Sequence, residues 1–269
     1  MHKGPIWAII VSIIAIVSIY FLTDIKENQD IQTINKVIDS DDNETISLFL
    51  DSIDEEERNT ALSLFQEARD SQDSAAVEAL IAFYEEKQQY NFAAYYHSLK
   101  AEITPLASNW EVAGDRQISV SSNAAYDVAF NEMLYEEALI SYQKAIDLDS
   151  SNLELQVKLG SAIVDRSPQP MQGITLLLGV IEQDSMHING NLALGKFGII
   201  SGQYDKAVIR LEKVLSLQPE NAEALFLSGE AYSNLGMNEK AISCFSKCKE
   251  IVENEDLKKE IDAYLQQLL

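Results

Sequence analysis

The side chains best suited to metal or redox chemistry are two cysteines, Cys244 and Cys248, which lie four residues apart. On a helix this spacing places both thiols on similar faces. A structural zinc site needs four ligands, but the three histidines, His2, His97 and His187, are scattered along the chain. A disulfide within one helical turn would be strained. We therefore predict two free thiols, one of them in the core, with neither a metal site nor a cofactor.

Catalytic motifs are the next feature to consider, and the sequence lacks H-E-x-x-H, G-x-x-x-x-G-K-[ST], G-x-S-x-G and G-x-G-x-x-G. Acidic pairs such as Glu136-Glu137 recur, but adjacent residues on a helix do not face each other. An enzyme site in the segment after Gly114 is an alternative, although that segment has no cluster of Ser, His or Cys nucleophiles. We predict that the protein is not an enzyme and has no catalytic residue.

The composition is that of a folded, strongly acidic protein. Hydrophobic residues make up 46% of the 269 positions, a normal fraction for a globular chain. The 43 Asp and Glu residues outnumber the 20 Lys and Arg residues, which gives a net charge of −23. Such a surface repels phosphate backbones, so we expect no nucleic-acid partner.

An apolar segment at the N-terminus has the length of a membrane span. Residues 4–23 carry no charge, and residues 6–22 are almost wholly apolar. Twenty helical residues extend about 30 Å, the thickness of the hydrocarbon core. A cleaved signal peptide would have a shorter apolar run and would end in small residues, whereas this run ends in Tyr20-Phe21-Leu22. We therefore predict an uncleaved transmembrane helix within residues 1–23, in contact with the membrane through residues 6–22.

The charges that flank this segment predict its orientation. Lys3 and the amino terminus precede it, and Asp24, Lys26, Glu27 and Asp30 follow it. The positive-inside rule then places the N-terminus in the cytoplasm. We expect a single-pass protein of a bacterial inner membrane, with its C-terminal part in the periplasm.

The C-terminal half contains a repeat of about 34 residues, which predicts stacked copies of one helical hairpin. Small residues recur at this spacing, 34 residues for the pairs Gly195–Gly229 and Ala207–Ala241 and 35 residues for Gly160–Gly195 and Ala138–Gly173. Between Gly114 and Gly160 the interval is 46, so one unit carries about a dozen additional residues. Either the first helix of that unit is extended, or an excursion lies between its two helices.

The repeated units resemble tetratricopeptide repeats. One unit has Leu194-Gly195, then Tyr204, Ala207 and Leu211 at the positions typical of the family, and closes at Pro219. The resemblance covers residues 107–252 well and 57–105 loosely. It departs from the family pattern at Gly173, at Pro168 and Pro170, and in the insert after Gly114.

The resemblance implies an all-α fold, a tetratricopeptide-type α-solenoid, behind an N-terminal transmembrane helix. We expect a membrane anchor at 1–23, a linker with a weak helix at 24–52, and a degenerate repeat region at 53–105. Repeats at 106–252, one of them with the long insert, and a capping helix at 253–269 would follow. We expect small residues where the two helices of a unit cross, because a larger side chain would push the backbones apart. These packing positions are Gly114, Ala138, Gly160, Gly195, Ala207, Gly229 and Ala241.

The same resemblance implies a concave groove lined by the first helix of each unit. By register the candidate partner-binding residues are Val157, Ser161, Val164, Leu192, Lys196, Ile199, Phe226, Glu230 and Ser233. Family members that clamp a C-terminal carboxylate use Lys, Asn and Arg in this groove, and Lys196 is the one base among the candidates here. We therefore expect a groove for an apolar or helical segment of a partner.

Taken together, these features predict a membrane-anchored scaffold or adaptor that binds client proteins or peptides, with a chaperone-like or assembly role. One alternative is a structural assembly factor that associates with itself as a homo-oligomer through the repeats. Another is a membrane receptor whose repeats face the cytosol, if the orientation is reversed.

Overall fold

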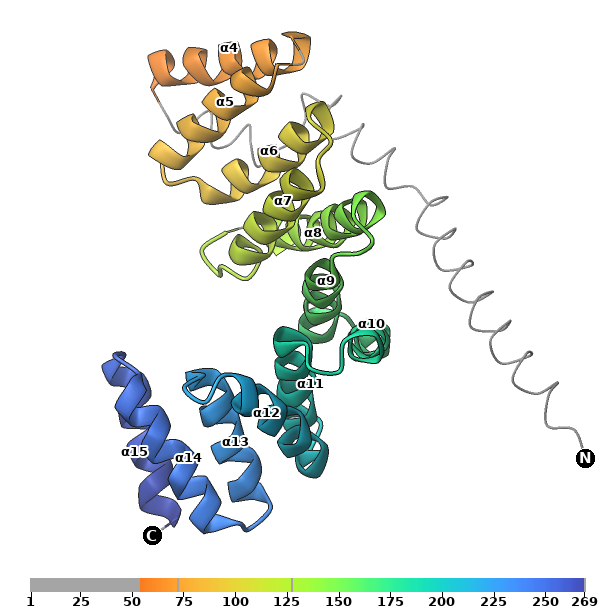
Figure 1. Ribbon diagram of the computed structural model, residues 1–269. Helices are drawn as coiled ribbons and strands as arrows, with labels where there is room; N and C mark the ends of the chain where they lie inside the picture. The colour runs from red at the N-terminus through yellow and green to blue at the C-terminus, as the bar shows by residue number, and fades with distance from the viewer. Residues whose placement is uncertain (1–53, 72, 127, 269) are drawn as a thin grey trace, which may run out of the picture. The chain divides into compact units, whose positions relative to one another are not determined.

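The computed structural model describes residues 54–71, 73–126 and 128–268, and this part of the chain is built from helices without strands (Figure 1). The prediction of an all-α fold is confirmed. The predicted anchor and linker, residues 1–52, lie outside the described residues. Among the helices that are described, none combines the length and the apolarity that a bilayer crossing requires.

Contacts between residues divide the chain into two units, 1–59 and 60–269, and the repeats all lie in the second. The described helices are α4 (Glu55–Ser71), α5 (Ser74–Glu86), α6 (Tyr90–Ile103), α7 (Ala107–Val120), α8 (Val128–Leu148), α9 (Leu153–Arg166), α10 (Pro170–Gln183), α11 (Ile188–Ile200), α12 (Tyr204–Leu217), α13 (Ala222–Asn234), α14 (Asn238–Ile251) and α15 (Glu255–Leu268).

Consecutive helices pair into five hairpins, α5–α6, α7–α8, α9–α10, α11–α12 and α13–α14. The second helix of each hairpin also contacts the first helix of the next, and α14 contacts α15 in the same way. The first helix α11 touches the first helices α9 and α13 directly. Each hairpin therefore buries its apolar face against its neighbours, which is the packing of a solenoid.

First helices begin in a different way from second helices, except for α7, which follows Leu106 without a side-chain cap. The first helices α5, α9, α11 and α13 start with a side-chain cap from Asp73, Asn152, His187 and Asn221. The second helices α6, α10, α12 and α14 have no such cap. Two of them follow a tight turn with a glycine at positive φ, Gly202 at 72° and Gly236 at 70°. Glycine adopts this left-handed conformation without a steric penalty.

The crossing of the two helices in each of the last four hairpins depends on a glycine in the first helix. A Cβ atom at Gly229 would lie 2.6 Å from the Phe245 ring, and one at Gly195 would lie 2.7 Å from Leu211. Gly114 faces Tyr142 and Gly160 faces Leu177 in the same manner. On the second helices Ala138, Ala207 and Ala241 are fully buried.

Gly173 departs from the family pattern for a steric reason. A Cβ atom there would collide with the backbone oxygen of Gly160 and would lie 2.8 Å from Val164. The helices α9 and α10 therefore approach each other so closely that alanine does not fit at this position.

The additional residues after Gly114 lie in the connection between α7 and α8 and in α8 itself. Helix α7 has 14 residues, as α9 has, so the alternative of an extended first helix is wrong. Seven residues separate α7 from α8, and α8 runs for 21 residues because it begins two turns earlier than the other second helices. Phe130 holds these early turns in place, because its ring centroid lies 5.4 Å from the ring centroid of Phe92 in α6.

Helix α15 covers the end of the last hairpin. Its buried residue Ile261 joins a core cluster with Phe245 and Cys248 of α14. On its exposed side, Lys258 and Lys259 pair with acids three residues earlier on the same helix. Both cysteines are free and Cys248 is buried, as predicted.

Candidate functional site

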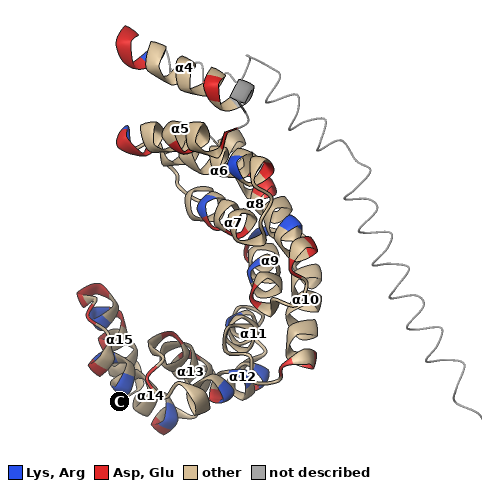
Figure 2. Cartoon of the chain, turned by 45° about the horizontal axis from the view of Figure 1, so that its top comes forward, with Lys and Arg blue, Asp and Glu red and all other residues tan. Residues whose placement is uncertain are grey.

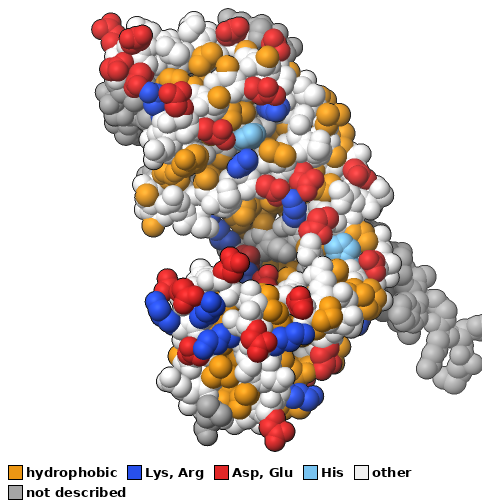
Figure 3. Space-filling model, turned by 60° about the vertical axis from the view of Figure 1, so that its left-hand side comes forward, with side chains coloured by type: hydrophobic (Ala, Val, Ile, Leu, Met, Phe, Trp, Pro, Cys, Tyr) orange, Lys and Arg blue, Asp and Glu red, His pale blue; other side chains and the backbone are white. Residues whose placement is uncertain are grey.

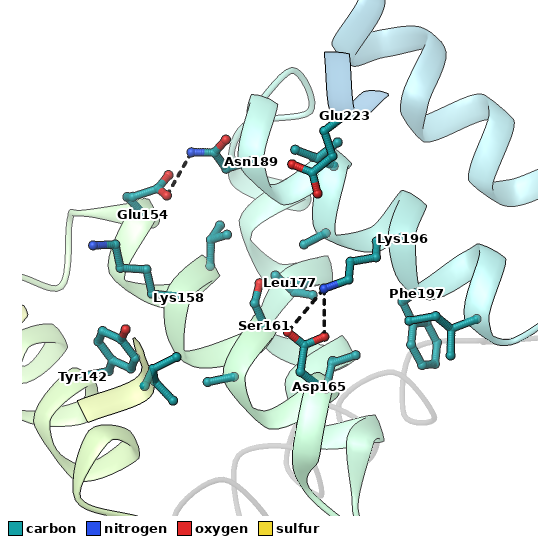
Figure 4. Close-up of a pocket in the computed structure, with 17 residues that line it drawn as sticks. Tyr142, Glu154, Lys158, Ser161, Asp165, Leu177, Asn189, Lys196, Phe197 and Glu223 are labelled. Atoms are coloured by element: carbon teal, nitrogen blue, oxygen red, sulfur yellow. Dashed lines mark hydrogen bonds and ion pairs between the residues drawn. The ribbon is translucent and has the colours of Figure 1, made fainter. Parts of the chain in front are cut away.

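A pocket of about 340 Å³ opens on the first helices of three neighbouring hairpins (Figure 4). This volume lies at the lower end of the range of roughly 300–1,000 Å³ that is usual for ligand sites. Most of its lining comes from α9 and α11, with single contributions from α7, α8, α10 and α13. The lining residues are Ile118, Tyr142, Glu154, Val157, Lys158, Ser161, Ala162, Val164, Asp165, Leu177, Asn189, Leu192, Ala193, Lys196, Phe197, Ile200 and Glu223.

The floor of the pocket is apolar and partly shared with the core. Val157 and Leu177 are buried members of one core cluster, and Val164, Ala193 and Phe197 pack against that cluster. At the margin, the side chain of Ile200 is 67% exposed. The pocket therefore offers a fixed apolar base and one apolar side chain that is free to meet a partner.

Lys158 is held on the rim by two carboxylates of the preceding hairpin. Its Nζ lies 2.7 Å from Glu111 Oε1 and 2.7 Å from Asp115 Oδ2. Burial acts to lower the pKa of Lys158, but the hydrogen bonds to Asp115 and Glu111 outweigh it, and the pKa is raised. The Tyr142 hydroxyl donates a 2.9 Å hydrogen bond to Asp115, and burial, reinforced by that carboxylate, raises its pKa above the usual value. Both groups therefore keep their protons at neutral pH.

The other polar groups of the pocket link α9 to α11 (Figure 4). Lys196 donates to the two carboxylate oxygens of Asp165 at 3.2 and 3.4 Å. Asn189 donates a 2.9 Å hydrogen bond to Glu154. The carboxylate of Glu223, on the first turn of α13, forms no hydrogen bond or ion pair with any residue that the structure describes. Nowhere in the described residues do three His, Cys, Asp or Glu side chains converge as a metal site would require.

Comparison with known protein families gives one match, in which residues 199–255 fit the tetratricopeptide repeat family. Residues 199–255 therefore carry a tetratricopeptide repeat. The matched residues run from the end of α11 through α14. The hairpins α7–α8 and α9–α10 before them also cross at a glycine of the first helix and contact their neighbours in the same order. No curated protein matches the sequence.

Solved structures of other proteins share this fold. PilW, described as a type IV pilus biogenesis factor, is 19% identical with a TM-score of 0.54, over 72% of this chain and 88% of PilW. The repeat protein TTC0263 of Thermus thermophilus is 16% identical with a TM-score of 0.53, over 72% of this chain and all of that one. The Cut9–Hcn1 assembly is 14% identical with a TM-score of 0.56, over 79% of this chain and 40% of that one. At these identities the likeness concerns the fold alone.

The structure brings five of the predicted groove residues of the tetratricopeptide repeats together in this pocket. These five residues are Val157, Ser161, Val164, Leu192 and Lys196. Ile199 lies on the same helix as Leu192 and packs with it against a neighbouring core cluster. Ser233, in the last turn of α13, is half-buried and does not line the pocket.

The remaining two predicted groove residues, Phe226 and Glu230 of α13, contact the capping helix. The Phe226 ring lies 5.8 Å from both the Phe245 and the Tyr264 rings, with an edge toward each. The Tyr264 hydroxyl donates a 3.0 Å hydrogen bond to Glu230. These two side chains therefore serve the packing of α15 and do not line the pocket.

Several lining residues were not among the sequence-based candidates, although the register contains a signal for them. Asp165 and Ile200 lie four positions after the candidates Ser161 and Lys196. Glu223 precedes the candidate Phe226 by three positions. Residues three or four apart share a helix face, so a wider stripe on each first helix would have included these positions.

Proposed function

We propose that this protein is a non-enzymatic interaction scaffold that holds an apolar segment of a partner protein in the pocket over α9, α11 and α13. The observation that carries this proposal is the pocket itself, with a rigid apolar floor and an exposed apolar margin at Ile200. The helices that line the pocket belong to stacked repeats, and stacked repeats form extended binding surfaces.

The chemistry of the pocket favours a protein segment over a small polar substrate. The two ammonium groups, Lys158 and Lys196, are already paired with carboxylates of the chain itself. The remaining surface that an occupant would touch is largely apolar side chain. Burying apolar area contributes roughly 25 cal/mol per Å², so an apolar side chain of a partner would gain affinity here.

Site-specific crosslinking tests this proposal directly. A photoreactive residue in place of Ile200, in the full-length chain expressed in native membranes, should capture a defined partner through the pocket. The matched control is Ile209 on α12, an isoleucine that is 58% exposed and does not line the pocket. Capture of the same proteins in equal yield from both positions would contradict the proposal.

We further propose that residues 6–22 anchor the scaffold in a membrane, with the repeats on the periplasmic side of a bacterial inner membrane. The uncharged N-terminal run and the charges that flank it support this arrangement. Protease added to intact spheroplasts should digest the repeats and leave a short protected N-terminal fragment. Full protection of the repeats would show the opposite orientation, that of a cytosol-facing receptor.

Self-association remains a distinct alternative for the scaffold. Size-exclusion chromatography with light scattering on the full-length protein in detergent separates the two cases. A monomeric mass, corrected for detergent, is expected for an adaptor that binds other proteins.

A further inference from the structure

The charges around the pocket do not balance, and this imbalance bears on the chemistry of its occupant. The carboxylates that line the pocket or pair with its lysines belong to Glu111, Asp115, Glu154, Asp165 and Glu223. Among the residues that line the pocket, Lys158 and Lys196 alone carry an ammonium group. Beside them, His187 Nε2 lies 3.9 Å from Glu154 Oε2. Acidic side chains are also spread over the surrounding helices (Figures 2 and 3).

We infer that the pocket binds a segment in which a lysine or arginine lies next to an apolar side chain, with Glu223 as the partner of that cation. This inference rests on the proposed function, since it specifies the chemistry of the segment that the pocket holds. Charge complementarity across an interface provides specificity and steers the approach of a partner.

Glu223 is placed to receive a cation without breaking an existing contact. Its side chain lines the pocket from α13, and it has no partner within the described part of the chain. It lies in the first turn of α13, where the helix dipole favours a negative charge. A lysine or arginine that reaches Glu223 therefore adds an ion pair at no cost to the pairs already present.

An anionic segment would meet the opposite situation. To reach Lys196 it would have to displace Asp165, whose side chain is 50% exposed and holds the lysine at 3.2 Å. To reach Lys158 it would have to compete with two carboxylates at 2.7 Å. In both cases the displaced carboxylate would remain close to the incoming anion, so like-charge repulsion opposes the exchange.

The apolar part of the occupant has a matching position. Figure 4 shows Glu223 and Phe197 entering the same pocket from different helices, with Lys196 between them. Ile200 follows Phe197 by three positions on α11 and is largely exposed at the margin. An apolar side chain seated beside Phe197 and Ile200 would leave its neighbour in sequence free to extend toward α13.

Peptide binding to the full-length chain in zwitterionic lipid nanodiscs tests this inference, with empty nanodiscs as the blank. The probes are two fluorescein-labelled pentapeptides with neutral ends, Ala-Leu-Lys-Leu-Ala and Ala-Leu-Glu-Leu-Ala. The lysine peptide should bind about fivefold or more tightly than the glutamate peptide, which corresponds to about 1 kcal/mol. The difference should shrink in 1 M salt, because salt screens exposed charges.

Two variants locate the effect. Glu223→Gln should remove most of the preference for the lysine peptide while it leaves helicity unchanged. The matched control is Glu239→Gln, which removes the same charge from the first turn of the next helix, α14, and should keep the preference. Equal loss in both variants would show a general field effect and contradict the assignment to Glu223.

The outcomes also separate this inference from the proposed function. If both peptides bind equally and Ile200→Asp abolishes the binding of each, the pocket binds apolar segments but does not select a cation, and the inference is wrong. If neither peptide binds, the inference is also wrong, while the crosslinking at Ile200 still decides the proposed function independently.

Discussion

Helices α11 and α13 occupy equivalent places in consecutive repeats, yet their groove-facing side chains do different things. Leu192 and Lys196 of α11 line the pocket. The residues 34 positions later, Phe226 and Glu230 of α13, contact Tyr264 of the capping helix. The difference lies in the helix that covers these positions, because Tyr264 of α15 packs on Phe226 and bonds to Glu230.

The same position in two repeats therefore has no fixed role. Whether a residue on a first helix binds a partner or stabilises the fold depends on what covers it. In this chain the pocket occupies the middle of the array, and the last hairpin uses the same surface for its own closure. Substitutions in the pocket and in the contact between α13 and α15 should therefore differ in their effect on stability.

Truncation of Phe226 should separate the two regions most clearly. Phe226→Ala removes a ring that packs edge-on against the stacked pair Phe245 and Tyr264, and we expect a loss of about 2–4 kcal/mol in unfolding free energy. Ile200→Ala in the pocket margin should cost less than about 0.5 kcal/mol, because that side chain is 67% exposed. Urea unfolding followed by circular dichroism measures both, and equal costs would remove the distinction.

The crossing glycines should behave alike in both regions. Gly195→Ala and Gly229→Ala each force a buried neighbour to move, so we expect a loss of about 1–3 kcal/mol for each. Gly179→Ala is the control, because a Cβ atom there meets nothing within 4 Å. It should stabilise the helix by about 0.5–1 kcal/mol. A lower melting temperature for Gly179→Ala than for Gly195→Ala and Gly229→Ala would contradict the packing argument.

Acid should weaken the packing of α6 on α7 before it affects the pocket on α9 and α11 or the contact between α13 and α15. Burial, with Arg116 and Lys100 nearby, lowers the pKa of His97 in the folded state to about 4. The unfolded chain takes up a proton near pH 6.5 and the folded chain does not, so stability falls as the pH drops from about 6.5 toward 4. We expect a loss of about 1–2 kcal/mol, because the side chain is partly exposed.

Hydrogen exchange at pH 7 and pH 5 measures where this loss occurs. Amides of α6 and α7 should lose protection at pH 5, and His97→Gln should suppress that change. If the wild type and His97→Gln both lost protection uniformly across α9–α14, another group would control the acid response.

The exposed ion pair in the pocket should contribute least to stability. Lys196→Met removes a pair with Asp165 in which both side chains are about half exposed, and such pairs contribute about 0–1 kcal/mol. A loss above about 1.5 kcal/mol in chemical unfolding would mean that the pocket is part of the structural core, and the comparison with α13 would fail.

Much of the fold follows from local features of the sequence. The spacing of Gly195, Gly229 and their partners predicted the hairpins, because only small residues allow the helices to cross closely. The insert after Gly114 was visible as an interval of 46 residues. Its distribution between a longer connection and the early turns of α8 was not, because those turns are stabilised by Phe92, a residue of another hairpin.

The candidate site was only partly visible from the sequence for the same reason. The register predicted that Leu192 and Lys196 face a groove, and the structure places both in the lining of the pocket. It also assigned Phe226 and Glu230 to the groove. A single sequence does not reveal that Tyr264 of α15 packs on these two residues.

The sequence by itself determined the period, the helical hairpins and the small residues at their crossings, since each depends on residues close in the chain. The tertiary structure decided which groove positions remain open, that Lys158 and Lys196 are neutralised across hairpins, and that Glu223 is left unpaired in the pocket of the described chain. Ion pairs such as Lys158–Asp115 join residues 43 positions apart. Such pairs exist only after the repeats have stacked.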